Sequence, residues 1–108
     1  REFIISHFYD GVLRLKFNDL CNKNLGAEDY LNISKISNHI FIEEIPIFND
    51  DNSNQQFRFI TLVDILYEKK ILLSLSLADD LKNLGSSQKH FKIFKRTTSR
   101  LIELTKKN

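Results

Sequence analysis

The feature that most constrains the fold is an amphipathic, helix-length segment between two short apolar runs. Residues 39–45 and 71–77 have the length and apolar content of strands, and residues 54–68 carry apolar side chains at helical spacing. Pro46 fits the end of the first run, because proline cannot donate to a strand ladder. This order predicts two parallel strands joined by a right-handed crossover. Apolar residues on both faces of 39–45 further predict a buried strand.

The remaining segments extend this unit in both directions. Residues 3–17 predict an N-terminal hairpin, because an Asp-Gly turn is followed by alternating apolar and basic residues. A loop is predicted from residue 18 onward. Helices are predicted over three further segments: 27–36, 79–84 (ending at Gly85) and 91–106. The prediction is one α/β domain over residues 1–108, in the order β-β-α-β-α-β-α. Its sheet is small, mixed and mostly parallel, with the hairpin at an edge.

Composition restricts the class of protein. Hydrophobic residues make up 42% of the chain and charged residues 28%, as in soluble globular domains. The net charge of +2 gives no strong field toward nucleic acid or a membrane, and no apolar run approaches the ~20 residues of a membrane span. The single Cys21 cannot form an intramolecular disulfide, so we expect a reducing, cytoplasmic location. The chain lacks Met and begins at Arg1, so we expect it to be part of a longer protein.

Motifs for catalysis by this chain alone are missing. Its three glycines cannot build the G-x-x-x-x-G-K-[ST] loop that cradles phosphates. Glu43 and Glu44 are adjacent on a predicted strand, so they should point to opposite faces and cannot form an acid–base pair. We therefore predict no catalytic residue in this chain.

Other potential ligands and nucleophiles are isolated in the sequence. They lack metal-ligand spacing, a neighbouring base or a G-x-S-x-G elbow: His7, His39, His90, Cys21, Ser74 and Ser76. No metal site is predicted.

The last predicted helix carries the most informative charges. Arg96 and Arg100 are four residues apart and so share a helix face, and Glu103 lies three residues beyond Arg100. This spacing fits either an anion contact, to a nucleotide phosphate or an acidic partner, or a solvated face with an exposed ion pair. Arg58 is a second candidate, because a base near a helix N-terminus is disfavoured by the helix dipole and so points to a specific partner.

Five segments, in order and at compatible spacing, resemble motifs from the C-terminal part of one ATPase family. F-N-D-L-C (17–21) resembles F-x-x-L-C, and D-Y (29–30) and the strand ending in I-P (42–46) also match. R-F-I-T-L-V-D-I-L-Y-E (58–68) is similar to R-F-I-x-L-V-D-E-[LF]-Y-[DE]. R-T-T-S-R-L-I-E-L (96–104) is similar to R-x-x-S-R-L-x-E-M. The family is that of the ZapE-like cell-division AAA+ ATPases and their mitochondrial, lactation-elevated-type relatives.

The chain also departs from the family pattern. Phe57 stands where the family has a first arginine, and Ile65 stands where it has glutamate. Leu104 replaces a final methionine, and the proline after the last strand is missing. These changes leave the implied fold intact, but a role for the first arginine cannot be carried over.

The resemblance implies a parent protein that binds and hydrolyses ATP with magnesium. Its P-loop would lie upstream of this chain, so the fragment alone should bind no cofactor and hydrolyse no ATP. Arginine's charge and planar fork suit phosphate or carboxylate, so three arginines become candidates for nucleotide sensing or subunit contact: Arg58, Arg96 and Arg100. Asp64 and Glu103 would orient them, or would simply cap the helix and pair with basic residues. The implied partners are the upstream ATPase domain, further copies of the protein, or a cell-division protein.

Two other interpretations remain open. The chain could be a non-catalytic module that recognises a protein through helix 91–106 or the hairpin edge. It could also bind nucleic acid through the bases of that helix: Lys92, Lys95, Arg96 and Arg100. The small net charge argues against nucleic acid.

Overall fold

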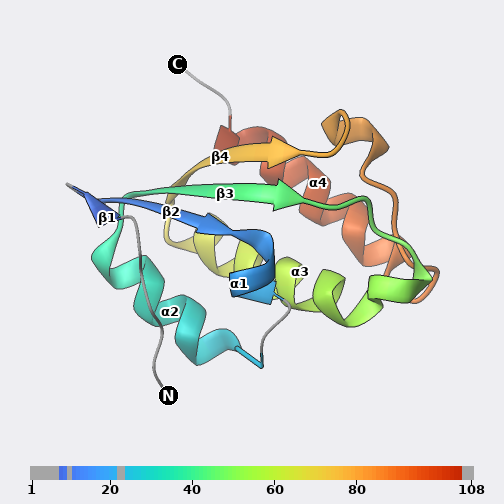
Figure 1. Ribbon diagram of the computed structural model, residues 1–108, viewed down its shortest axis with the longest axis horizontal. Coiled ribbons are helices and arrows are strands. Elements are labelled where there is room, and N and C mark those ends of the chain that lie inside the picture. The colour runs from blue at the N-terminus through green and yellow to red at the C-terminus, as the bar shows by residue number, and fades with distance from the viewer. Residues whose placement is uncertain (1–7, 10, 22–23, 106–108) are drawn as a thin grey trace.

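The computed structural model describes residues 8–9, 11–21 and 24–105, the first two by their backbone alone. Apart from the unpredicted helix α1, its helices and strands follow the predicted order (Figure 1). They are β1 (Phe8–Tyr9), β2 (Val12–Lys16), α1 (Phe17–Cys21), α2 (Ala27–Ile36), β3 (His39–Ile45), α3 (Ser53–Glu68), β4 (Leu72–Leu77) and α4 (Phe91–Thr105). Two short 3₁₀ turns, η1 (Asp50–Asn52) and η2 (Leu81–Asn83), precede α3 and follow β4.

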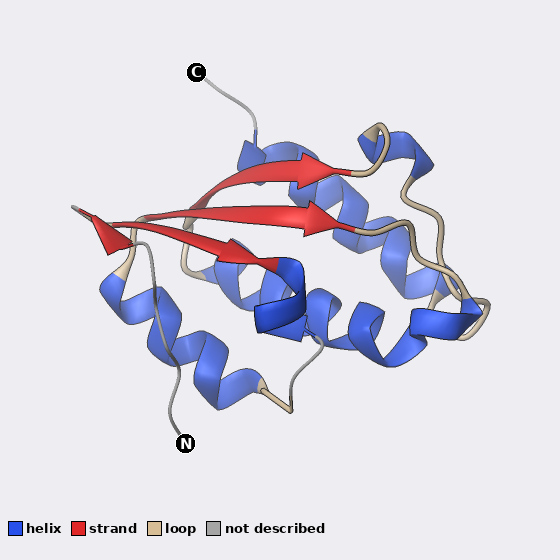
Figure 2. Cartoon of the chain, viewed as in Figure 1, coloured by secondary structure: helices blue, strands red, loops and turns tan. Residues whose placement is uncertain are grey.

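The sheet has the predicted mixed, mostly parallel topology. Its strand order is β1-β2-β3-β4, with β1 antiparallel to β2 and the other neighbours parallel. α2 and α3 are the crossovers between neighbouring parallel strands, and both lie on the same side of the sheet (Figure 2). α4 packs beside α3 and β4. The predicted α/β fold with a hairpin at the sheet edge is confirmed.

Some predictions concern residues that are not described. The first arm of the predicted hairpin, residues 3–5, and the basic residues Lys106 and Lys107 lie outside the described residues. Within the described part, β1 pairs Phe8 with Leu13 and Tyr9 with Val12.

One face of the sheet is covered by helices and the other is more open. On β2, Leu13 and Leu15 are buried, whereas Arg14 and its neighbours on the opposite face are exposed. β3 follows the same alternation, because Ile42 is buried and Phe41 is only half buried, with the Arg14 guanidinium 4.8 Å from its ring centroid. The prediction that residues 39–45 form a strand buried on both faces is therefore correct for the helix-covered face, whereas the other face is only partly buried.

An aromatic cluster ties the helices to the chain that leaves β3. Phe48, just beyond β3, lies 5.6 Å from the rings of both Phe17 and Phe59 and 5.3 Å from that of Phe94. These four phenylalanines come from α1, α3, α4 and the segment after β3, and all are buried. Tilted and edge-on aromatic contacts at these distances add to the stabilisation from apolar burial.

The segment predicted to end a strand and begin a loop at residues 17–18 instead forms α1. Phe17, Leu20 and Cys21 are buried together, at the i, i+3 and i+4 spacing of a helix. Two long-range donors satisfy carbonyls at the end of α1: the Tyr30 hydroxyl donates to Leu20 O at 2.7 Å, and Arg58 Nη1 donates to Cys21 O at 3.0 Å. Tertiary contacts therefore stabilise a helix too short to be recognised from the sequence.

The predicted helix over 79–84 is shorter than expected and is a 3₁₀ turn, η2. Gly85 has a positive φ of 74°, but its place is set by β-bridge pairing with Phe48 rather than by the end of an α-helix. A Cβ at Gly85 would lie 2.6 Å from Phe48 O. Glycine is therefore required where this segment meets the chain after β3.

The prediction that Glu43 and Glu44 point to opposite faces is wrong. Glu44 has a positive φ of 59°, and the pairing of β3 with β4 shifts register between Ile42 and Ile45. This bulge turns the strand locally. Glu43 consequently pairs with Arg14 at 3.1 Å and Glu44 with Lys16 at 3.3 Å, and both bases lie on the same exposed face of β2. Each carboxylate thus has a basic partner.

Candidate functional site

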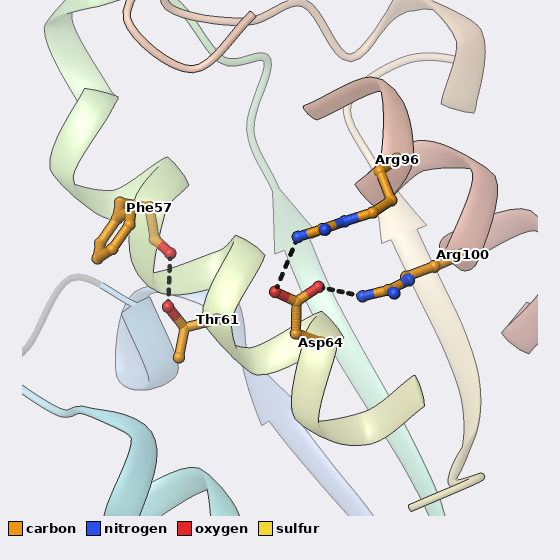
Figure 3. Close-up of polar contacts among 5 residues, drawn as sticks. All are labelled: Phe57, Thr61, Asp64, Arg96 and Arg100. Carbon is orange, nitrogen blue, oxygen red and sulfur yellow. Dashed lines mark hydrogen bonds and ion pairs between the residues drawn. The ribbon is translucent and has the colours of Figure 1, made fainter. Parts of the chain in front are cut away.

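The buried face of α4 determines where its charged residues lie. Phe94, Thr97, Leu101 and Leu104 are buried at the spacing of one helix face. The arginines beside this face project from α4 toward Asp64, which lies on the neighbouring helix α3 (Figure 3).

Asp64 brings together two of the arginines predicted from the sequence. Its Oδ1 accepts a hydrogen bond from Arg100 Nη1 at 2.6 Å, and its Oδ2 accepts one from Arg96 Nη2 at 3.5 Å (Figure 3). One carboxylate therefore holds two guanidinium groups side by side. Asp64 thus contacts both of the arginines that it was expected to orient.

The two arginines are held to different degrees. Arg100 makes the shorter contact, its side chain is 26% exposed, and its guanidinium carbon lies 4.6 Å from the centroid of the Tyr67 ring. Arg96 is 54% exposed and its contact with Asp64 is at the long limit of a hydrogen bond. Arg100 is thus the anchored arginine, and Arg96 is the one that presents its donors to solvent.

Tyr67 and Glu103 complete this group, which we call the Asp64 cluster: Asp64, Tyr67, Arg96, Arg100 and Glu103. Glu103 lies next to the Tyr67 hydroxyl, and interaction with its carboxylate raises the pKa of Tyr67. Arg100 pairs with Asp64, and no ion pair joins it to Glu103 among the described residues. Tyr67 was not predicted as a site residue from the sequence. Its spacing of three residues from Asp64 nevertheless places both side chains on one side of α3.

Arg58 does not join the Asp64 cluster. Its Nη1 donates to Cys21 O, and so it interacts with the C-terminal end of α1, where the helix dipole favours a positive charge. The prediction that Arg58 has a specific partner is met by this carbonyl. Phe57, the residue at the position of the family's first arginine, stacks on His90 with ring centroids 5.5 Å apart.

Cys21, the last residue of α1, and Tyr30 of α2 are both buried. Burial raises the pKa of both groups. The thiolate is the reactive form of cysteine, so a raised pKa makes Cys21 a poor nucleophile.

The structure also pairs two residues that are far apart in sequence. His39 Nε2 and Ser74 Oγ lie 2.8 Å apart across β3 and β4. A hydrolytic site needs, in addition, an acid that orients the histidine and donors for an oxyanion. Because the pair links neighbouring strands on the open sheet face, we interpret it as a cross-strand hydrogen bond.

The described residues contain neither a metal-binding cluster nor a membrane-spanning helix. No group of three or more His, Cys, Asp and Glu side chains in this part of the chain could hold a metal ion. No helix over the same ranges is long and apolar enough to cross a membrane.

Comparison with known proteins identifies the family. The model of the AFG1-like ATPases matches residues 1–108. The chain belongs to this family. It is 33% identical to lactation elevated protein 1 homolog B of Danio rerio over 71 residues, which are 66% of the chain and 14% of the relative. It is 27% identical to the cell division protein ZapE of Escherichia coli K12 over 93 residues, 86% of the chain and 25% of the relative.

The AFG1-like chain thus spans a quarter or less of the length of these two relatives. No solved structure matches it. The resemblance inferred from the five motifs is confirmed at the level of the family, and the Asp64 cluster lies within two of those motifs.

Proposed function

We propose that this chain is the C-terminal domain of an AFG1-like ATPase and that Arg96 contacts an anion in the assembled enzyme. That anion would be a phosphate of the bound nucleotide or a carboxylate of a neighbouring subunit. The observation that carries the proposal is the position of Asp64, which holds Arg96 and Arg100 side by side at the surface between α3 and α4.

The geometry gives the two arginines different roles in this proposal. Arg100 is a positioning residue, because it is fixed by Asp64 and by the Tyr67 ring. Arg96 is the contact residue, because it is more exposed and more loosely held. A guanidinium pre-oriented by a carboxylate can still donate from its other N–H groups in the planar fork that suits phosphate and carboxylate oxygens. Arg58 is a less favoured candidate, because Cys21 O engages it.

ATP and magnesium belong, in this proposal, to the longer protein. The 108 residues contain no P-loop sequence, so groups that hold the nucleotide's phosphates would have to come from elsewhere in that protein. The residues of this chain that fit a phosphate are arginines, and they would act by charge stabilisation and orientation. We expect the isolated chain to hydrolyse no ATP, and we propose a cytoplasmic location for the whole protein.

The test is the ATPase rate of the longer protein carrying Arg96→Ala. We expect kcat to fall by at least about tenfold, because arginines that stabilise a transferring phosphoryl group are worth more than this. Arg96→Lys should recover only part of the rate, since lysine lacks the planar fork. The matched control is Lys92→Ala, which removes a positive charge one turn earlier on α4 and should change kcat less than twofold. An unchanged rate in Arg96→Ala would overturn the proposal.

Mixed assemblies show whether Arg96 acts in its own subunit or on a neighbouring one. Arg96→Ala subunits are combined with subunits whose P-loop lysine has been replaced, and the ATPase rate of the mixture is measured. Activity above the sum of the two variants means that Arg96 acts on a neighbouring subunit's site. No recovery, with mixing verified by co-purification of two tags, means that Arg96 acts within its own subunit.

A non-catalytic protein-interaction module is the second candidate function. It is favoured by the exposed apolar side chains of α4, Phe91, Ile93 and Ile102. Under this alternative, Arg96→Ala would leave the ATPase rate of the longer protein unchanged, whereas loss of an exposed apolar side chain of α4 would weaken binding of a partner.

A further inference from the structure

A groove runs along α4 on the side away from the Asp64 cluster. It has a volume of about 720 Å³ and lies between α4 and residues 80–86, the segment that contains η2. Its floor is apolar, formed by the buried Leu84 and Phe94, and Phe91 and Ile102 stand at its rim with 55% and 58% of their surfaces exposed. The role proposed above for Arg96 does not use this surface, which we call the α4 groove, whereas a protein-interaction module would use it.

The α4 groove has the length of a short helix. The α4 residues that line it include Phe91, Lys95, Thr98 and Ile102, at positions i, i+4, i+7 and i+11 of one helix face. At 1.5 Å per residue this stripe is about 16 Å long, the length of three helical turns. The α4 wall has no backbone groups free to pair with an extended strand, because an α-helix satisfies its interior N–H and C=O groups internally.

The opposite wall is equally unsuited to strand pairing. Leu84 O accepts from Phe48 N at 2.7 Å, Leu84 N donates to Leu81 O, and Asn83 N donates to Asp80 O. These backbone groups are engaged within the fold. A bound peptide would therefore gain its affinity from side chains in the groove, which is how an amphipathic helix binds an apolar groove.

The charges around the α4 groove are mostly positive. Lys82 and Lys95 line it from opposite walls, against the single acid Asp80. The Lys95 ammonium lies 4.9 Å from the centroid of the Phe91 ring, so it is held over the apolar rim. A partner that complements this surface has acidic residues beside its apolar ones.

We propose that the α4 groove binds an amphipathic helix of an acidic partner protein. Two or three apolar side chains of that helix, spaced i, i+3 or i+4 and i+7, enter between Phe91 and Ile102. Aspartate or glutamate beside them pairs with Lys95 and Lys82. The proposal is independent of the role of Arg96, because the groove and the Asp64 cluster lie on different sides of α4.

The test is a display selection of random 16-residue peptides on the immobilised 108-residue chain. We expect enriched peptides to combine helically spaced apolar residues with at least two acids. A synthetic copy of the most enriched peptide, labelled with fluorescein, is then titrated with the chain by fluorescence anisotropy. Ile102→Ser should weaken its binding at least about tenfold, in line with the loss of a central apolar anchor.

Two further variants complete the design. Lys95→Glu should weaken binding and remove most of its salt dependence. Ile93→Ser is the matched control, because Ile93 is an apolar residue of α4 that is 45% exposed and does not line the groove. It should leave the dissociation constant unchanged. Circular dichroism verifies that each variant is folded.

Other results would overturn the proposal. No enrichment on the chain over Ile102→Ser, or equal binding by both, would show that the groove takes no helix. Enriched peptides without acids would refute the acidic partner. Concentration-dependent dimerisation of the chain in sedimentation velocity, abolished by Ile102→Ser, would assign the groove to a second copy. Binding of laurate, with no peptide enriched, would assign it to an amphiphilic carboxylate.

Discussion

At the scale of single residues, Thr97 stands out because its buried hydroxyl makes no hydrogen bond among the described residues. It is fully buried on α4. A buried hydroxyl without a partner loses its hydrogen bonds to water and gains none in return. Valine has nearly the same shape and no hydroxyl.

Thr97→Val should therefore leave the fold unchanged and raise the free energy of unfolding by about 1 kcal/mol. Urea denaturation at pH 7 measures this difference. Thr98→Val is the control, because Thr98 is partly exposed and its hydroxyl donates to Lys95 O at 2.9 Å. If Thr97→Val is destabilising by more than 1 kcal/mol, the Thr97 hydroxyl has a hydrogen-bond partner after all.

The sequence could place some residues of the Asp64 cluster together and not others. Arg96 and Arg100 share a face because of their spacing on one helix, and the same rule relates Tyr67 to Asp64. The two pairs meet only because α4 packs against α3. Arg96 and Arg100 are 32 and 36 positions away from Asp64 in the chain. Local spacing contains no information about such a long-range contact. The link between Asp64 and the arginines was predicted only from the resemblance to the family.

At the scale of elements, the strongly periodic segments were predicted best. α2 and β3 have the predicted ends, 27–36 and 39–45, and α3 begins one residue before the predicted start. α1 and the bulge at Glu44 were missed for a common reason. Each depends on partners distant in sequence: Tyr30 and Arg58 for α1, and the pairing of β3 with β4 for the bulge.

The junction of the η2 segment with the chain after β3 gives a prediction at this scale. Gly85→Ala should lower the free energy of unfolding by about 2–3 kcal/mol, because it adds a strained positive φ and a contact with a backbone carbonyl that has little room to move. Thermal and urea denaturation measure the loss. At Gly26, nothing lies within 4 Å of an added Cβ and φ is negative. Gly26→Ala should change stability by about 1 kcal/mol or less, the range of helix-capping effects. Equal effects of the two substitutions would contradict this account of Gly85.

At the scale of the whole molecule, the buried pair Cys21 and Tyr30 links stability to alkaline pH. Burial raises the pKa of both groups in the folded chain above their ordinary values. Below those ordinary values both groups are protonated in the folded and unfolded states, and their contribution is fully present. As the pH rises further, the unfolded chain loses these protons first, and stability falls by up to about 1.4 kcal/mol per pH unit for each group.

We therefore expect the free energy of unfolding to decrease steadily above about pH 9, where an ordinary cysteine ionises. Cys21→Ala should be less stable at pH 7, because it leaves a small cavity, but its stability should fall less steeply between pH 9 and pH 11. Urea denaturation at a series of pH values gives both slopes. Identical slopes would mean that Cys21 does not contribute to the alkaline loss.

The strand order has a consequence for how the chain is made. Each parallel strand pairs with the one that precedes it, so the β2–α2–β3 and β3–α3–β4 units are each complete within a few dozen residues of synthesis. The aromatic cluster is different, because Phe94 follows Phe48 by 46 positions in the chain. A nascent chain on the ribosome can therefore assemble its sheet while the rings of Phe17, Phe48 and Phe59 still lack their last neighbour. Emergence of α4 from the exit tunnel completes the core.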